Sequence, residues 1–192
     1  MSSTQRGYNR HKSDYYVTPQ EDIRLFLKAF TENNEIKRPI LDPCAGGDME
    51  HKMSYPEALK DIGYTGVITT DIREDSRAFH RPVDYLEWEA RTETGDRFST
   101  IITNPPFNLA QEIIEKALDD VAEGGHVIML LRLNFFGSKK RFDFWKNNMP
   151  IRCYVHHKRM SFTDEGGTDS IEYMHCVWKK GENPEHCKLE II

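Results

Sequence analysis

The chain has 192 residues, of which 38% are hydrophobic and 30% charged, and its formal net charge is −5. This is the composition of one ordinary globular domain that buries roughly 70% of its unfolded surface. It excludes collagen, a coiled coil and a fully disordered chain. No apolar run approaches the ~20 residues of a transmembrane helix, and residues 1–12 lack the apolar core of a signal peptide. The four cysteines contain no C-x-x-C pair, so we expect reduced thiols in a cytoplasmic protein.

The first half of the chain predicts two helices and two short strands. Residues 1–14 are expected to form a flexible arm, and residues 15–192 a single domain. A helix is predicted to begin with Thr18 as its N-cap and Pro19 in its first turn, because apolar residues then recur at helical spacing. The elements expected next are a strand over residues 39–41 that ends at Asp42, a helix over residues 55–62 stopped at Gly63, and a strand over residues 67–70 that ends at Asp71.

The second half predicts further alternation of strands and helices. Residues 98–103 form an apolar strand that ends at Asn104. Asn108 is expected to cap an amphipathic helix that carries Val121 on its apolar face and closes at Gly124 and Gly125. The remaining predicted elements are a strand over residues 127–131, a helix over residues 138–147, and late strands over residues 151–155 and 174–178.

This order of elements predicts an α/β fold. Almost continuously apolar strands that alternate with helices are typical of a mostly parallel sheet with helices on both faces. Ligands of such sheets bind beyond the carboxyl ends of the strands. Asp42, Asp71 and Asn104 each follow a strand end, so we expect the functional site at this edge of the sheet.

A glycine-rich turn, Asp42-Pro43-Cys44-Ala45-Gly46-Gly47-Asp48, follows the first predicted strand. Such a turn lets the backbone approach a ligand closely. It lacks the G-x-G-x-x-G spacing of a dinucleotide-binding turn, which disfavours a dehydrogenase. Asp71 ends the next strand, where a carboxylate can accept hydrogen bonds from ribose hydroxyls. By itself, an aspartate there is equally typical of a turn.

The segment Asn104-Pro105-Pro106-Phe107 is the most specific signal in the sequence. Two prolines stiffen the loop and remove two N–H donors, so that carbonyl acceptors remain. The Asn104 side-chain oxygen and the Pro105 carbonyl can then both accept hydrogen bonds from one planar amino group. Phe107 offers a face on which the ring that bears this amino group can stack. A simple strand-ending turn requires neither the amide nor the aromatic residue.

The ordered set of Thr18-Pro19, the glycine-rich turn, Asp71 and Asn-Pro-Pro-Phe resembles S-adenosylmethionine-dependent amino-methyltransferases. Within them it is most similar to short, phage-type DNA N6-adenine methyltransferases, over residues 15–178. The resemblance implies one Rossmann-like class I methyltransferase domain with S-adenosylmethionine as cofactor. Asn-Pro-Pro-Phe does not fix the acceptor, because RNA-adenine and protein-glutamine methyltransferases carry related motifs.

The resemblance also implies a role for each matching residue. Asn104, Pro105, Pro106 and Phe107 would be catalytic and hold the target base. The residues implied in cofactor binding are Thr18 and Pro19 near the methionine end, Asp42, Pro43 and Gly46 in the turn, Asp71 on the ribose, Ile72 and Asp84 at the adenine, and Asn104. Family members often have Gly-x-Gly in the turn, so Asp48 is a departure that predicts a crowded or shifted loop.

The charge distribution suggests a partner. Residues 131–160 hold eight Lys and Arg against one acid, Asp143, a net charge of +7, so the rest of the chain carries −12. We expect this basic block to contact DNA phosphates, although a solvated face would have the same composition. The eight histidines lack metal-ligand spacing, so no metal is expected. Residues 161–170 are expected to shape a loop at the mouth of the site.

The sequence thus predicts methyl transfer to the exocyclic amino group of adenine in DNA. Two alternatives stay open: the same transfer to RNA adenine or protein glutamine, and a module that binds cofactor or nucleic acid without catalysis. The sequence predicts neither the recognition site nor the oligomeric state, and no membrane partner is expected.

Overall fold

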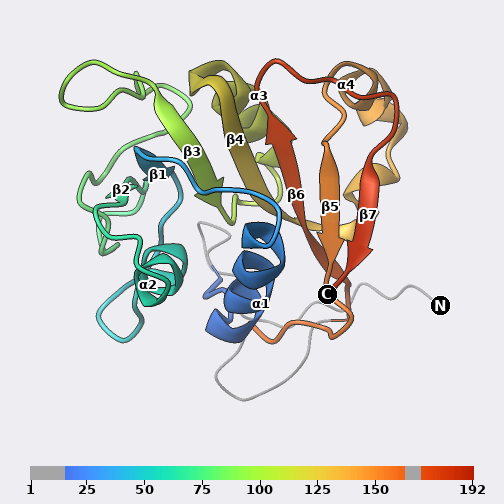
Figure 1. Ribbon diagram of the computed structural model, residues 1–192. Coiled ribbons are helices and arrows are strands. Elements are labelled where there is room, and N and C mark those ends of the chain that lie inside the picture. The colour runs from blue at the N-terminus through green and yellow to red at the C-terminus, as the bar shows by residue number, and fades with distance from the viewer. Residues whose placement is uncertain (1–15, 163–169) are drawn as a thin grey trace.

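The computed structural model describes residues 16–162 and 170–192, and Figure 1 shows a central sheet between two layers of helices. The predicted arm and most of the predicted mouth loop, residues 163–169, lie outside the described residues. The sheet has seven strands in the order β2-β1-β3-β4-β6-β5-β7. The strands are β1 (Ile40–Asp42), β2 (Ile68–Thr69), β3 (Phe98–Thr103), β4 (Val121–Arg132), β5 (Arg152–Val155), β6 (Tyr173–Lys179) and β7 (Lys188–Ile191).

The sheet is mostly parallel. Strand β1 pairs in parallel with β2 and β3, β3 with β4, and β5 with β7. Only β6 runs against its neighbours, β4 and β5. The strands other than β6 therefore end at one edge, which is the lower edge of the sheet in Figure 1. The predicted α/β fold with a mostly parallel sheet is confirmed.

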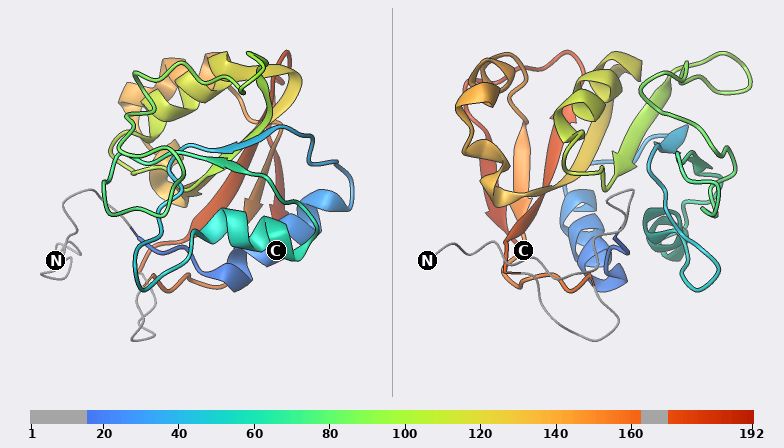
Figure 2. Two further views of the ribbon diagram at one scale, coloured as in Figure 1. Left: turned by 90° about the vertical axis from the view of Figure 1, so that its left-hand side faces the viewer. Right: turned by 180° about the vertical axis from the view of Figure 1, so that it is seen from behind.

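Helices cover both faces of the sheet (Figures 1 and 2). The helices α1 (Gln20–Thr31) and α2 (Ser54–Asp61) pack on one face and share a buried core with Ile40, Ile102 and Ile128. The helices α3 (Ala110–Asp120) and α4 (Phe142–Asn147) pack on the other, with Leu41 and Ile101 in their core. Neighbouring strand residues thus serve opposite layers, because side chains alternate along a strand.

Two predicted helix starts are each wrong by one residue. Pro19, not Thr18, takes the N-cap position of α1, with φ −60° and ψ 129°. The Thr18 hydroxyl is instead bonded to Asn104. Leu109, not Asn108, precedes the first residue of α3. Neither helix has a side-chain hydrogen bond at its N-cap.

The later boundaries also differ from the predictions. Helix α3 ends at Asp120 rather than near Gly124, because Val121 already pairs with Phe98 as the first residue of β4. The helix expected over residues 138–147 divides into a 3-10 turn over 139–141 and α4. A 3-10 turn over 133–136 precedes them, and strand β7 was not predicted. No helix of the described residues is long and apolar enough to cross a membrane.

Candidate functional site

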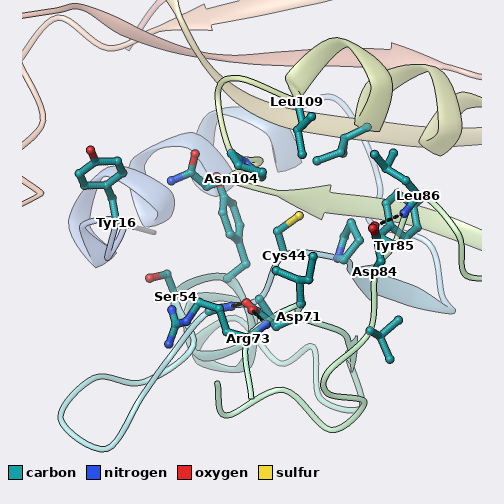
Figure 3. Close-up of a pocket in the computed structure, with 18 of the residues that line it drawn as sticks. Tyr16, Cys44, Ser54, Asp71, Arg73, Asp84, Tyr85, Leu86, Asn104 and Leu109 are labelled. Atoms are coloured by element: carbon teal, nitrogen blue, oxygen red, sulfur yellow. Dashed lines mark hydrogen bonds between the residues drawn. The ribbon is translucent and has the colours of Figure 1, made fainter. Parts of the chain in front are cut away.

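A cavity opens at the carboxyl edge, beyond the ends of β1, β2 and β3 (Figure 3). In Figure 3, Tyr16 and Asn104 lie toward one end of it, Asp84 and Leu86 toward the other, and Asp71 and Cys44 between them. Of the residues implied by the resemblance, the lining includes Thr18, Pro43, Gly46, Asp71, Ile72, Asp84, Asn104 and Pro106. The structure therefore brings together residues that are up to 88 positions apart in the chain.

The glycine-rich turn after β1 has a backbone that only glycine adopts easily. Gly46 and Gly47 have φ values of 65° and 73°. A Cβ atom on Gly47 would lie 3.0 Å from the Met53 Cγ and 3.1 Å from the Met53 backbone nitrogen. The glycines thus allow a tight left-handed turn against the chain that enters α2.

Asp71 ties this turn to the end of β2. Its carboxylate accepts hydrogen bonds from the Gly46 N–H and the Arg73 N–H, both at 2.8 Å. Only 6% of Asp71 is exposed. Each carboxylate oxygen has a second lone pair, so Asp71 can still accept hydrogen bonds from hydroxyl groups of a ligand in the cavity.

Asp48 does not crowd the turn in the way the sequence predicted. Its Oδ1 accepts hydrogen bonds from the Glu50 N–H at 2.9 Å and the His51 N–H at 2.8 Å. The His51 ring lies 2.9 Å from the same oxygen. Asp48 is not among the cavity-lining residues. It closes a local turn beside the cavity.

The wall beyond Asp71 is apolar. It includes Ile72, which is 58% exposed, together with Val83, Leu86 and Leu109. Asp84 borders this wall, and its Oδ1 accepts a hydrogen bond from the Leu86 N–H at 3.0 Å. A slot of apolar side chains with a carboxylate at its rim suits a flat ring that carries an amino group.

Asp42 lies beneath the cavity and is fully buried. Its Oδ1 accepts a hydrogen bond from the Cys44 N–H at 3.3 Å, and its Oδ2 has no hydrogen-bond partner. Burial raises the pKa of Asp42 to about 7, and the Asp71 carboxylate acts in the same direction. The Thr103 hydroxyl and the Cys44 N–H, in contrast, favour the charged form. A nearby cation would favour ionisation of this carboxyl.

Asn104, directly after β3, connects the end of the sheet to the start of α1. Its Nδ2 donates a hydrogen bond to the Thr18 hydroxyl at 2.9 Å. The Asn104 Oδ1 is buried and has no hydrogen-bond partner. A buried acceptor without a partner costs about 1–3 kcal/mol, so a donor supplied by a ligand would be favourable here.

Four implied residues do not line the cavity: Pro19, Asp42, Pro105 and Phe107. Phe107 packs beside Tyr173, with ring centroids 5.8 Å apart. The guanidinium of Arg132 lies over its ring, 4.2 Å from the centroid. The stacking face expected from Phe107 is therefore covered.

Several lining residues escaped the sequence prediction, chiefly three tyrosines. Tyr16 precedes α1, Tyr55 lies in α2, and the Tyr85 hydroxyl donates a hydrogen bond to Asp120 Oδ2 at 2.9 Å. From the sequence alone, aromatic residues such as these are expected to pack in the core. Tyr85 follows Asp84 directly, which was the one available signal. Within the described ranges, no cluster of three or more His, Cys, Asp or Glu could hold a metal ion.

No protein-family model matches the chain, and no curated protein does. Solved structures do. A Listeria monocytogenes protein, provisionally named a class I S-adenosylmethionine-dependent methyltransferase, matches with TM-score 0.63 and 16% identity over 95% of this chain and 67% of that one. A provisionally named RNA methyltransferase from Pyrococcus horikoshii matches with TM-score 0.62 and 14% identity over 93% and 94%.

A third match is the methyltransferase subunit of a Streptococcus thermophilus type I restriction-modification system. Its TM-score is 0.65 and its identity 12%, over 92% of this chain but only 47% of that subunit. The chain thus spans about half of the restriction subunit that it matches. Together these likenesses show that the chain has the Rossmann-like fold of class I methyltransferases.

Proposed function

We propose that the protein transfers a methyl group from S-adenosylmethionine to the exocyclic amino group of adenine in DNA. The observation that carries this proposal is the Asn104 amide at the edge of the cavity. Its nitrogen is bonded to Thr18, and its buried oxygen has no partner. That leaves an acceptor for an amino group beside a cavity that suits a nucleoside.

The cavity residues fit S-adenosylmethionine from end to end. Asp71 offers acceptors to the ribose hydroxyls, and the apolar wall with Ile72 and Leu86 offers a slot for the adenine. The Asp84 carboxylate lies at the rim of that slot. Asp42 does not line the cavity, but it directly precedes the lining residues Pro43 and Cys44, and its unpaired oxygen offers negative charge for the methionine amino group. When bound, the cofactor supplies an activated methyl group on its sulfonium.

The protein's own residues would then make a weak nucleophile reactive. The amino nitrogen of adenine is a poor nucleophile because its lone pair is delocalised into the ring. Acceptors at its two N–H bonds stabilise the pyramidal nitrogen as these bonds gain positive character. The Asn104 Oδ1 and the Pro105 carbonyl are the acceptors that we assign to this role. Because the sulfonium is already activated, no strong general base is required.

The choice of DNA as acceptor rests on charge and on the motif. Arg132 ends β4, and Lys158 and Arg159 follow β5, so these members of the basic block lie at the edge that holds the cavity. The block is not one continuous patch: Arg152 pairs with Glu190 at 2.7 Å, and Arg141 lies over the Phe135 ring. Arg159 is also paired, with Glu172 at 3.1 Å. We therefore expect phosphate contacts chiefly from Arg132 and Lys158, and fewer from Lys139, Lys140, Arg141 and Arg159.

The test is incubation with labelled S-adenosylmethionine and adenine-unmethylated DNA, RNA or a protein extract, followed by separation of the digested products. Label is expected in N6-methyladenine from DNA. Asn104→Ala should fold normally, bind cofactor and lose about 10²–10³ in turnover, as when a preorganised contact to a transition state is removed. Asn108→Ala is the matched control, because it alters an exposed asparagine of the same loop.

The outcomes separate the candidate functions. Label in RNA or glutamine that depends on Asn104 would keep the chemistry and change the acceptor. No label anywhere, with cofactor binding demonstrated, would favour a non-catalytic module. Equal turnover by the Asn104 and Asn108 variants would contradict the assigned role of Asn104.

A further inference from the structure

The cation–aromatic contact at the end of β4 stands where the proposed function requires a base. Arg132 is the last residue of β4, on the edge that holds Asn104. Its guanidinium carbon lies 4.2 Å from the Phe107 ring centroid. Phe107 is three residues beyond Asn104, so the covered ring belongs to the segment that carries the unpaired amide oxygen. A planar, cationic group thus occupies the aromatic face of the segment that carries the acceptor.

The surroundings hold the guanidinium only weakly. Its Nε donates a hydrogen bond to the Tyr173 hydroxyl at 3.4 Å, which is long for such a bond. Among the described residues, no carboxylate is paired with Arg132. The Phe107 ring, in contrast, packs against a small buried cluster of Leu130, Met160 and Tyr173. The ring is therefore fixed by the core, and the guanidinium is the more weakly held partner of the stack.

A second arginine–phenylalanine stack in the same segment provides the contrast. The Arg141 guanidinium carbon lies 4.0 Å from the Phe135 centroid, and its Nη1 also donates a hydrogen bond to the Phe135 carbonyl at 3.1 Å. Phe135 is buried against Phe144 and Trp145. This stack closes the hydrophobic core under α4. The Arg132 stack, in contrast, belongs to the Asn-Pro-Pro-Phe segment, whose Asn104 oxygen has no partner.

We propose that Arg132 fills the place of the target base in the free protein and is displaced from Phe107 when the base enters. The inference rests on the proposed function, since it requires a flat base to be held near Asn104. A guanidinium is planar and stacks on aromatic faces as a base does. Released from Phe107, the cation lies at the rim of the site and pairs with a DNA phosphate. Entry of the base and capture of the backbone are thereby coupled through one side chain.

The exchange compensates part of the cost of removing a base from the duplex. Base flipping costs unstacking and unpairing energy. An empty aromatic face would be exposed to water or collapse before the base arrived, whereas Arg132 keeps it open and flat. The base then gains the stacking contact that the guanidinium gives up, and the guanidinium gains a phosphate.

Proton NMR of the arginine side chains tests this exchange directly. A ring current from Phe107 shifts the Arg132 Nε–H signal, and a ring current from Phe135 shifts that of Arg141. The two signals are assigned with Arg132→Ala and Arg141→Ala. The protein is then titrated with a duplex that contains the adenine site identified in the methylation assay, in its unmethylated form. S-adenosylhomocysteine is present to prevent turnover. A second titration uses a duplex of the same length with G·C pairs only.

The adenine duplex should return the Arg132 signal to its unstacked position, whereas the G·C duplex should not. The Arg141 signal should stay shifted in both titrations. DNA affinity is also measured at several salt concentrations. Arg132→Ala should reduce the slope of log affinity against log salt concentration by about one, and Arg141→Ala should not.

The opposite outcomes are equally clear. If the wild-type protein methylates DNA but its Arg132 signal stays shifted with the adenine duplex, the exchange is wrong and the proposed function stands. The same holds if the G·C duplex moves the signal equally, because phosphate alone would then displace Arg132. If the wild-type protein methylates no DNA, the proposed function fails first and the exchange with it.

Discussion

The middle of the cavity, around Asp71, and its Asn104 end differ in how far their polar groups are already satisfied. At Asp71, the carboxylate accepts two backbone N–H groups, and the Ser76 hydroxyl donates to the Gly46 carbonyl at 2.6 Å. At the Asn104 end, the amide oxygen has no partner, and the nearby aromatic face is covered by Arg132. The hydrogen bonds of Asp71 are formed before any ligand arrives, whereas the Asn104 oxygen would gain its partner only from a ligand.

This difference suits the two ligands that we propose. A cofactor that takes part in every reaction binds best to a rigid surface that is already formed, because fewer protein side chains lose conformational freedom on binding. A base in a duplex arrives only after flipping, so its site must stay open without it. Substitutions in the two parts should therefore act separately, on cofactor affinity near Asp71 and on turnover near Asn104.

Asp71→Ala should have the largest effect at the prebuilt end. It removes acceptors for ribose hydroxyls, each worth about 1.5–3 kcal/mol as a charge-assisted bond. It also leaves the Gly46 and Arg73 N–H groups without their acceptor. Calorimetric titration with S-adenosylmethionine should show at least a tenfold loss of affinity. Glu74→Ala, at an exposed carboxylate of the same loop, should bind as the wild type does; equal affinity in both variants would remove Asp71 from the site.

The affinity for S-adenosylmethionine should increase with pH up to neutrality. Burial raises the pKa of Asp42 to about 7, so below pH 7 the carboxyl is increasingly neutral and cannot attract the cofactor's ammonium. Affinity should fall by up to tenfold for each unit below pH 7 and level off above it. The stability of the free protein has the opposite dependence: it is highest below the ordinary carboxyl pKa of about 4 and falls as the pH rises from there to about 7, where the buried carboxyl ionises.

Asp42→Asn distinguishes this carboxyl from other titrating groups. The variant should bind cofactor weakly at every pH, with the slope below pH 7 removed. The same measurement on Asp84→Asn, whose carboxyl lies at the rim, should keep the slope. A wild-type affinity that is flat between pH 5 and pH 8 would contradict the role of Asp42.

Thr18→Val acts at the other end, through Asn104. The substitution keeps the shape of the side chain but removes the acceptor for the Asn104 Nδ2. The amide can then rotate, so turnover should fall about three- to tenfold, as expected for one neutral hydrogen bond. Thr18→Ser should restore turnover. Thr100→Val removes a hydroxyl bonded to the Lys37 carbonyl, away from the carboxyl edge; it should lower stability without lowering turnover.

The sequence could predict the polar centre of the site for a physical reason. Asp42, Asp71 and Asn104 each follow a short apolar strand, and the ends of parallel strands must meet at one edge. Their proximity therefore follows from local patterns and from one rule of topology. The glycine turn is equally local, because the left-handed backbone of Gly46 and Gly47 is available to few other residues.

What the sequence could not show depends on contacts across the fold. Arg132 and Phe107 are 25 residues apart, and they lie at or just after the ends of two different strands. No rule of sequence spacing predicts that their side chains stack. Tyr16 and Tyr55 line the cavity only because α1 and α2 pack on one face of the sheet. Strand β7 was missed because Leu189 and Ile191 are both more than 60% exposed, so this edge strand has no buried pattern to reveal it. Helix starts shifted because neither expected cap side chain bonds to its helix end.

The smallest effect is expected from Asp48→Gly, the substitution that restores the glycine often found in related turns. If Asp48 crowded the cofactor loop, the variant would bind S-adenosylmethionine more tightly. In the structure, however, its carboxylate accepts the Glu50 and His51 N–H groups and does not line the cavity. We therefore expect cofactor affinity to change by less than about threefold and the free energy of unfolding to fall by about 0.5–1.5 kcal/mol for each hydrogen bond lost. Calorimetric titration and urea unfolding of the same samples measure both quantities. A gain of tenfold or more in affinity would show that the cofactor end is not as complete as its hydrogen bonds indicate.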